Sequence, residues 1–128
     1  MTNFSETTIQ KVWDKVRTVT GVDKDVWRKG PCGAWINRLS YGKETSYGWQ
    51  IDHVYPQDLG GKDDMVNLRA MQWENNISKG NNYPDYTAVI TSEGNKNIRK
   101  KQSRTVVDSL RKKLDKLYGK PKTQKKSN

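Results

Sequence analysis

Four polar residues in the middle of the chain have types and spacings that suit acid–base and metal chemistry. Asp52 and His53 are adjacent at the end of the apolar run 49–51, and Asn67 and Asn76 follow the histidine by 14 and 23 positions. Carboxylate and carboxamide oxygens are hard ligands that suit Mg²⁺, and a neutral imidazole can take a proton from water near neutral pH. Hydrolysis of a phosphodiester requires a bound cation, an activated water and rigid placement of both.

Each residue of this pattern has a chemical and a simpler interpretation. Asp52 and Asn76 would supply oxygen ligands and His53 would act on the water, while an asparagine bonded to the imidazole N–H would fix its tautomer. The simpler alternatives are an ordinary strand-end acid, a surface or satisfied core histidine, a turn residue at Asn67 and a surface helix residue at Asn76. The types and order of these residues together, rather than any one of them, indicate a site.

The pattern resembles the motif of the HNH endonuclease family. The family's residues occur in the same order and spacing: Asp52-His53, Pro56, Gly60-Gly61, Val66-Asn67-Leu68 and Asn76-x-x-Lys79-Gly80. The similarity covers about residues 27–86, and the spacing also looks like that of the HNH domain in RNA-guided CRISPR nucleases. The segments 31–36, 41–42 and 47–49 look like those of small stand-alone HNH proteins of bacteria and phages.

The resemblance implies a role for each residue of the motif. Asp52 would be the first metal ligand, and Asn76, presented from a helix, would be the second, with its neighbour Asn75 as the alternative. His53 would be the general base on the attacking water, and Asn67 would hold His53 in place. The implied fold is a ββα-metal centre, a hairpin followed by a helix, in an α+β protein with flanking N- and C-terminal helices.

The implied ligand set also indicates the metal. Both ligands are oxygens, so Mg²⁺ or Mn²⁺ is expected in preference to Zn²⁺ or Ni²⁺. The chain has one cysteine, Cys32, and one histidine, which excludes paired-cysteine and paired-histidine sites, so no structural zinc is expected. Cys32 is interpreted as a small buried residue, and Asp58, Asp63 and Asp64 are interpreted as solvated loop residues rather than ligands.

Positive charge is concentrated in the last quarter of the chain. Residues 94–128 carry 13 of the 24 Lys and Arg residues and two of the 14 acids, a net +11 against +10 for the whole chain. This asymmetry predicts a polyanionic partner, most simply nucleic acid, although a solvated basic helix with a solubilising tail would give the same composition. The cations expected to contact phosphates are Arg69, Lys79, Arg99, Lys100, Lys101 and Arg104, and Arg69 is equally compatible with an ordinary surface position.

Hydrophobic spacing indicates the elements that must position the motif. The spacing predicts helices over 5–19, 73–79 and 103–118 and strands over 34–36, 48–51, 66–71 and 87–92. The strands 34–36 and 48–51 are expected to pair with each other. We expect one domain over residues 1–118, with the motif at 30–86, followed by a lysine-rich disordered tail over 119–128.

Composition limits the class of protein. Apolar residues make up only 32% of the 128 residues, so the core must be small, and five tryptophans and six tyrosines compensate in part. Trp35, Trp49 and Trp73 are expected in the core rather than as platforms for bases. No apolar run approaches a membrane span and the N-terminus lacks a secretory signal, so a cytoplasmic protein without a membrane partner is expected.

These features predict an endonuclease that depends on a divalent metal and hydrolyses phosphodiester bonds, with DNA the expected substrate ahead of RNA. Two alternatives remain from the sequence. One is a basic nucleic-acid-binding module with an inactive site, and the other is a toxin-type nuclease that needs an immunity partner. The sequence leaves open whether the protein dimerises, whether it nicks or cuts both strands, and which sequences it prefers.

Overall fold

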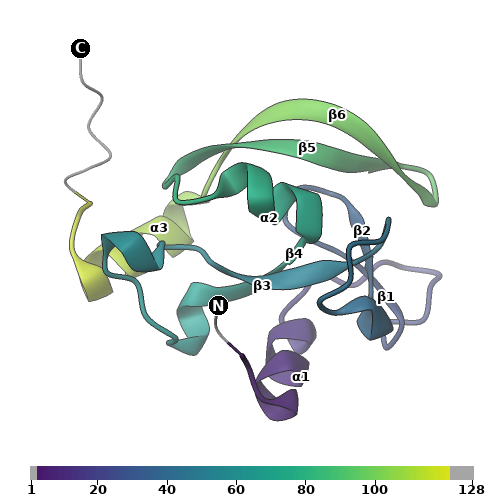
Figure 1. Ribbon diagram of the computed structural model, residues 1–128, viewed down its shortest axis with the longest axis horizontal. Coiled ribbons are helices and arrows are strands. Elements are labelled where there is room, and N and C mark those ends of the chain that lie inside the picture. Colours follow the sequence, from purple (N-terminus) through teal and green to yellow (C-terminus); the bar gives the residue numbers. More distant parts are fainter. Residues whose placement is uncertain (1–2, 122–128) are drawn as a thin grey trace.

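Three antiparallel hairpins and three helices make up residues 3–121, the part of the chain that the computed structural model describes (Figure 1). The helices are α1 (Glu6–Asp14), α2 (Trp73–Lys79) and α3 (Asp108–Tyr118). The paired strands are β1 (Trp27–Lys29) with β2 (Trp35–Asn37), β3 (Trp49–His53) with β4 (Leu68–Gln72), and β5 (Asp85–Glu93) with β6 (Lys96–Thr105). The α+β class expected from the sequence is therefore confirmed.

The elements lie in layers around the β3–β4 hairpin. In Figure 1 the long β5–β6 hairpin lies at the top, α2 lies beneath it, and β3 and β4 follow, with α1 at the bottom. Short 3₁₀ helices occupy the connections at Arg38–Ser40, Gln57–Leu59 and Met65–Asn67. The β3–β4 hairpin is thus covered by a helix on each side.

Helix α1 confirms the predicted apolar stripe but is shorter than the predicted helix over 5–19. The Ser5 side chain accepts a hydrogen bond from the Thr8 amide at 3.1 Å and caps the first turn. At the other end, the buried guanidinium of Arg28 donates to the carbonyls of Trp13 and Val16. These carbonyls are satisfied by a side chain from outside the helix, which allows the helix to end early.

The expected pairing of strands 34–36 and 48–51 is wrong. The strand at 34–36 corresponds to β2, which pairs with β1, whereas β3 pairs with β4 and places Asp52 opposite Arg69. The short segment Trp27–Lys29 contains two cations and lacks the alternation of a half-buried strand, so no sequence pattern indicates β1. The β3–β4 register buries Trp49 and Ile51 against α1 and leaves Asp52 on the opposite face.

Helix α2 follows β4 without a loop, at the position that the sequence predicts. The Gln72 side chain accepts hydrogen bonds from the amides of Glu74 and Asn75 at 2.9 and 3.1 Å, so the last residue of the strand caps the helix. The helix ends at Lys79 and the chain turns at Gly80. A hairpin that leads directly into a capped helix fixes the positions of the side chains on β3 and α2 relative to each other.

The basic segment after residue 94 differs most from the prediction. Residues 96–105 form the strand β6, and helix α3 begins at Asp108 rather than at 103. The side chains of β6 are mostly charged and polar, so the strand shows no hydrophobic alternation, and β5 supplies the apolar contacts of the pair. Of the predicted apolar stripe of α3, Leu114 is buried and Leu110 packs against the core, but Val107 and Leu117 are exposed. Most of the tail predicted over 119–128 lies outside the described residues.

Two clusters of buried side chains form the core. One joins α1 to the β3–β4 hairpin through Trp13 and Trp49, and the other joins β5 to α3 and contains Cys32, buried as expected. Trp35 and Trp49 are buried and Trp73 is partly buried, with its indole donating to the Thr45 carbonyl. Among residues 3–121, no helix has the length and apolar character needed to cross a membrane.

Candidate active site

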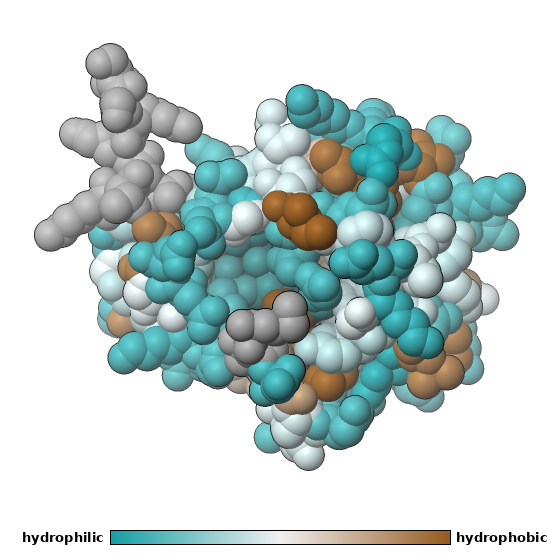
Figure 2. Space-filling view, viewed as in Figure 1, coloured by the Kyte–Doolittle hydropathy of each residue, from teal (hydrophilic) through white to brown (hydrophobic). Residues whose placement is uncertain are grey.

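A polar hollow of about 240 Å³ lies where the end of β3 meets the C-terminal half of α2. Asp52, His53 and Asn76 all line it, together with Asp58 and Asn81, whose side chains are hydrogen-bonded to each other at 2.6 Å. Figure 2, viewed from the same side as Figure 1, shows a mainly hydrophilic face that is hollowed between α2 and β3. Three of the four residues singled out from the sequence therefore border one space, which we call the polar hollow.

Asp52 lies on the α2 side of the hairpin and is only 4% exposed. Its Oδ2 is 3.1 Å from Nε of Arg69, its cross-strand partner, and its Oδ1 is 3.4 Å from Nζ of Lys79 on α2. Two cations therefore lie beside one buried carboxylate, and their attraction offsets part of the free-energy cost of burying it.

The two cations beside Asp52 are themselves buried. Burial lowers the pKa of Lys79, and the Asp52 carboxylate opposes part of that shift. Burial also disfavours the charged form of Arg69, yet Asp52 and Tyr86 hold the pKa of Arg69 above its usual value. The sequence predicts phosphate contacts for both side chains. In the structure both bind Asp52, and Lys79 has no exposed surface left for a phosphate.

His53 is oriented by a loop carboxylate. Its Nε2 lies 2.6 Å from Oδ1 of Asp63, and its ring centroid is 6.1 Å from that of Phe4. An ionised carboxylate can only accept hydrogen bonds, so Nε2 carries the proton in this pair and Nδ1 of the neutral ring is left with the lone pair. The interpretation of Asp63 as a solvated loop residue therefore misses this contact. No sequence pattern indicates it, because the contact depends on how the 3₁₀ turns fold the loop.

Asn67 holds the loop between β3 and β4. Its side chain is fully buried, accepts from the Tyr55 amide at 2.7 Å, and donates to the carbonyls of Tyr55 and Lys62 at 3.0 Å each. The predicted contact with His53 is not among the hydrogen bonds that the described residues make. Asn67 instead fixes the backbone on both sides of the Asp63 loop, so any effect on His53 is indirect.

The Gly60-Gly61 pair allows this loop to close. A Cβ atom at Gly61 would collide with the carbonyl of Tyr55 and crowd Nδ2 of Asn67, and Gly60 adopts a φ of 109°. Only glycine permits such a close approach of backbone to backbone. The family-like glycines thus support the placement of Asn67 and, through the loop, of Asp63.

The adjacent asparagines of α2 have separate environments. Asn75 is buried and binds β5, accepting from the amides of Val89 and Ile90 at 2.8 Å and donating to the Ile90 carbonyl at 2.9 Å. Asn76 lines the polar hollow and donates through Nδ2 to Gln50 at 2.9 Å. Its Oδ1 has no hydrogen bond within the described part of the chain. The structure therefore favours Asn76 over Asn75 as a candidate ligand.

The oxygen donors of the polar hollow are of the chemical type that hard divalent cations prefer. Asp52 provides a carboxylate and Asn76 a free carboxamide oxygen, both of the type that Mg²⁺ accepts. Within residues 3–121, no three His, Cys, Asp or Glu side chains are grouped so that they could hold an ion by themselves. Mg²⁺ commonly takes one or two protein oxygens with waters and substrate phosphate oxygens, so a donor set of this size is compatible with it.

The basic residues predicted to bind a phosphate backbone do not share one environment. Arg99 is hydrogen-bonded to Glu74 of α2, and Arg104 donates to the Pro31 carbonyl at 2.7 Å. Lys100 and Lys101 are exposed on β6. The four residues therefore belong to one strand, but Arg99 is paired with an acid and Arg104 with a backbone carbonyl, whereas the two lysines are exposed.

Comparisons of the chain with protein-family models, with curated proteins and with solved structures gave no match.

Proposed function

We propose that the protein is an endonuclease of the HNH type, with a ββα-metal centre, that hydrolyses phosphodiester bonds of DNA with the help of Mg²⁺ or Mn²⁺. The observation that carries the proposal is that Asp52, His53 and Asn76 line one polar hollow. The hairpin β3–β4 followed directly by α2 supports it, since this is the order of elements that the family resemblance implies. The residues proposed for chemistry and for positioning then all lie within the segment 52–79.

Asp52 and Asn76 are the residues that would hold the metal. A bound divalent ion acts as a Lewis acid that stabilises negative charge on phosphoryl and leaving oxygens. Arg69 and Lys79 already bind the Asp52 carboxylate, so they compete with any added cation. We therefore expect weak metal binding by the free protein and tighter binding when substrate phosphate contributes oxygens of its own.

His53 is the general base of the proposal, with Nδ1 as the atom that takes the proton from water. Asp63 accepts the Nε2 proton and holds the ring in that tautomer. When Nδ1 takes a proton, the same carboxylate lies beside the imidazolium, and because the Asp63 side chain is 54% exposed, solvent screens part of that attraction. Asp63 acts through His53 and is a positioning residue.

The substrate is proposed from charge. The exposed Lys100 and Lys101 and the basic segment after residue 94 favour a polyanion. Binding through phosphate contacts weakens steeply as salt concentration rises. The proposed site has no element for reading bases, so low sequence preference is expected.

A plasmid-nicking assay tests the proposal. The wild-type protein should convert supercoiled plasmid to nicked or linear DNA with Mg²⁺ or Mn²⁺, less effectively with Zn²⁺, and not at all after EDTA is added. The Asn76→Ala variant should lose this activity, while the matched Asn82→Ala variant, changed at an exposed position outside the hollow, should keep it. Equal rates for the wild type and Asn76→Ala would contradict the proposal.

One observation favours a second function, nucleic-acid binding without cleavage. Arg69 and Lys79 engage both oxygens of Asp52. If no metal displaced these two cations, Asp52 would not act as a metal ligand and the site would be inactive. DNA binding that persists with no nicking under any divalent metal would support this alternative.

A further inference from the structure

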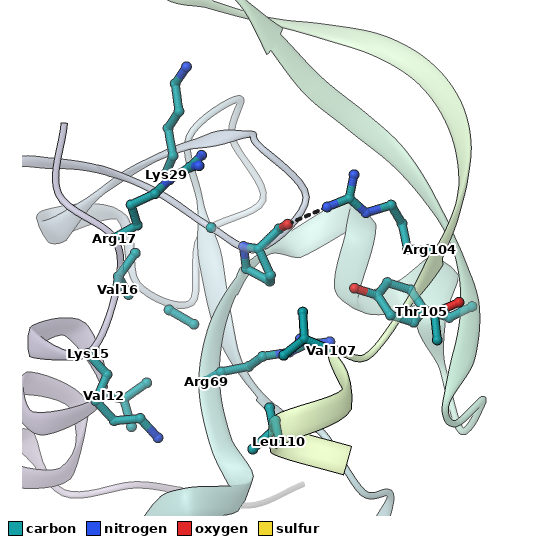
Figure 3. A pocket seen from close by; sticks show the side chains of 14 residues that line it. Val12, Lys15, Val16, Arg17, Lys29, Arg69, Arg104, Thr105, Val107 and Leu110 are labelled. Atoms are coloured by element: carbon teal, nitrogen blue, oxygen red, sulfur yellow. Dashed lines mark hydrogen bonds between the residues drawn. The ribbon is translucent and has the colours of Figure 1, made fainter. Parts of the chain in front are cut away.

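A second cavity, of about 340 Å³, lies on the other side of the β3–β4 hairpin. It is bordered by the end of α1, by β4, and by β6 with the start of α3 (Figure 3). Figure 3 shows Arg69 extending from β4 on one side and Arg104 reaching from β6 to Pro31 on the other. We call this space the arginine cavity, and nothing in the proposed cleavage chemistry uses it.

All the charged residues that line the arginine cavity are positively charged. Five of its residues are cationic and none is acidic, and the cations are Lys15, Arg17, Lys29, Arg69 and Arg104. Lys15 donates to the carbonyls of Met65 and Leu68, and the Lys29 ammonium lies 4.8 Å from the Trp35 ring centroid. The three arginines, each with five N–H donors, keep more capacity for a ligand than Lys15 does.

The arginines have donors that the protein does not satisfy. Nη2 of Arg69 is buried and has no hydrogen-bond partner among residues 3–121, although the same guanidinium binds Asp52 through Nε. Such an unpaired buried donor costs free energy and calls for a partner. Arg104 uses Nη2 for the Pro31 carbonyl, and Arg17 is exposed with no side-chain hydrogen bond or ion pair in the described part of the chain.

The walls of the cavity add apolar surface to this charge. Val12, Val16, Val107 and Leu110 line it alongside the arginines. A volume near 340 Å³ is at the lower end of the range for small-molecule sites and is larger than an inorganic anion needs. The ligand that fits has a compact apolar or flat body and an anionic group suited to the guanidinium fork, which binds phosphate well.

We propose that the arginine cavity binds an organic phosphate of mononucleotide size. The phosphate would be held by Arg17, Arg69 and Arg104, with the body of the ligand against the valines and Leu110. The phosphate has two possible sources, a free mononucleotide or the phosphorylated end of a nucleic-acid strand. This inference does not depend on the proposed cleavage activity, because the cavity shares no lining residue with the polar hollow.

Isothermal titration calorimetry in EDTA tests the site without any contribution from metal or cleavage. The probes are thymidine 5′-monophosphate, thymidine, inorganic phosphate, and one short oligonucleotide with and without a 5′-phosphate. We expect the monophosphate to bind at least tenfold more tightly than thymidine or inorganic phosphate. If the free nucleotide is the source, the two oligonucleotides will bind equally, and if a strand end is the source, the 5′-phosphate will strengthen binding.

A pair of double variants assigns the binding to the cavity. Arg17→Gln with Arg104→Gln should weaken binding of the monophosphate at least tenfold. Lys112→Gln with Lys113→Gln, which removes the same charge from exposed positions of α3 outside the cavity, should leave it within about twofold. Circular dichroism checks that both double variants are folded. The proposal would be overturned if the wild type did not bind the monophosphate, or if both folded double variants lost the same amount of binding affinity.

Discussion

The two edges of the β3–β4 hairpin border spaces of opposite character. Along β3, the polar hollow brings together a carboxylate, an imidazole and a carboxamide, and along β4 the arginine cavity has cations and no acid. The two spaces meet at one ion pair, because Asp52 of β3 and Arg69 of β4 are cross-strand partners. A single hairpin thus separates groups suited to act on water from groups suited to hold a phosphate.

The two regions also differ in how their polar groups are satisfied. Around the polar hollow, Asn67, Asn75 and Lys79 are fully buried or nearly so, and each has hydrogen-bond partners that fix its position. In the arginine cavity, Nη2 of Arg69 is buried and, among the described residues, has no partner. A satisfied network gives the rigid placement that catalysis requires, whereas an unsatisfied buried donor costs free energy that a partner would recover.

Replacing Arg69, whose ion pair with Asp52 joins the two regions, should have the largest effect on stability. Arg69→Met leaves Lys79 as the sole partner of the buried Asp52 carboxylate, and we expect the free energy of unfolding to fall by about 3 kcal/mol. Arg104→Met removes one exposed hydrogen bond, to the Pro31 carbonyl, and should cost less than about 1 kcal/mol. Urea denaturation measures both, and equal stability of the two variants would show that the hairpin does not depend on the ion pair.

The adjacent asparagines of α2 should separate stability from activity. Asn75→Ala removes three hydrogen bonds to β5 and should lower the free energy of unfolding by about 2–3 kcal/mol. Asn76→Ala removes one partly exposed bond, so its stability should stay within about 1 kcal/mol of the wild type while nicking is lost. Urea denaturation and the nicking assay on both variants check this, and the reverse result would assign the ligand to Asn75.

The positioning residue should have a smaller effect on the rate. In Asp63→Asn the side chain can donate as well as accept, so the imidazole loses its fixed tautomer, and we expect nicking to slow by about tenfold to a hundredfold. Asp64→Asn, one residue further along the loop and bonded to Tyr118, is the matched control and should retain most of the rate. Single-turnover nicking rates at neutral pH measure the difference, and equal rates would remove Asp63 from the mechanism.

The weakest expected effect concerns the hydrogen bond between Tyr118 of α3 and Asp64 in the loop before β4. Burial and a hydrogen bond to Asp64 raise the pKa of Tyr118 to about 12, so the folded protein favours the protonated phenol. Stability from this group is full below the ordinary tyrosine pKa of about 10 and is lost as pH rises through about 12. Unfolding titrations between about pH 9 and pH 12 should show a small loss for the wild type that is reduced in Tyr118→Phe.

The sequence predicts β4 and α2 well because the residues that indicate these two elements lie close together in the chain. The helix expected over 73–79 and the strand that precedes it lie at nearly the observed positions, since caps, glycines and apolar runs lie within a few residues of one another. The same compact motif predicts a shared site for Asp52, His53 and Asn76, and these three residues line the polar hollow. Local chemistry and local structure are consistent here.

The remaining errors have a common physical cause, because they depend on contacts between distant segments. Strands β1 and β6 are short or highly charged and are stabilised by their partners rather than by their own pattern. The Asp63–His53 bond depends on the fold of a loop, and the arginine cavity collects residues from positions 12 to 110. No spacing rule in a single sequence brings such residues together.

The most direct test of the central claim is the nicking rate of His53→Ala in Mg²⁺. Loss of a general base typically slows a reaction by about 10²–10⁴-fold, and we predict a decrease in this range with an unchanged circular dichroism spectrum. Binding of thymidine 5′-monophosphate should be unaffected, because His53 does not line the arginine cavity. A folded His53→Ala protein that nicks plasmid as fast as the wild type would contradict the account.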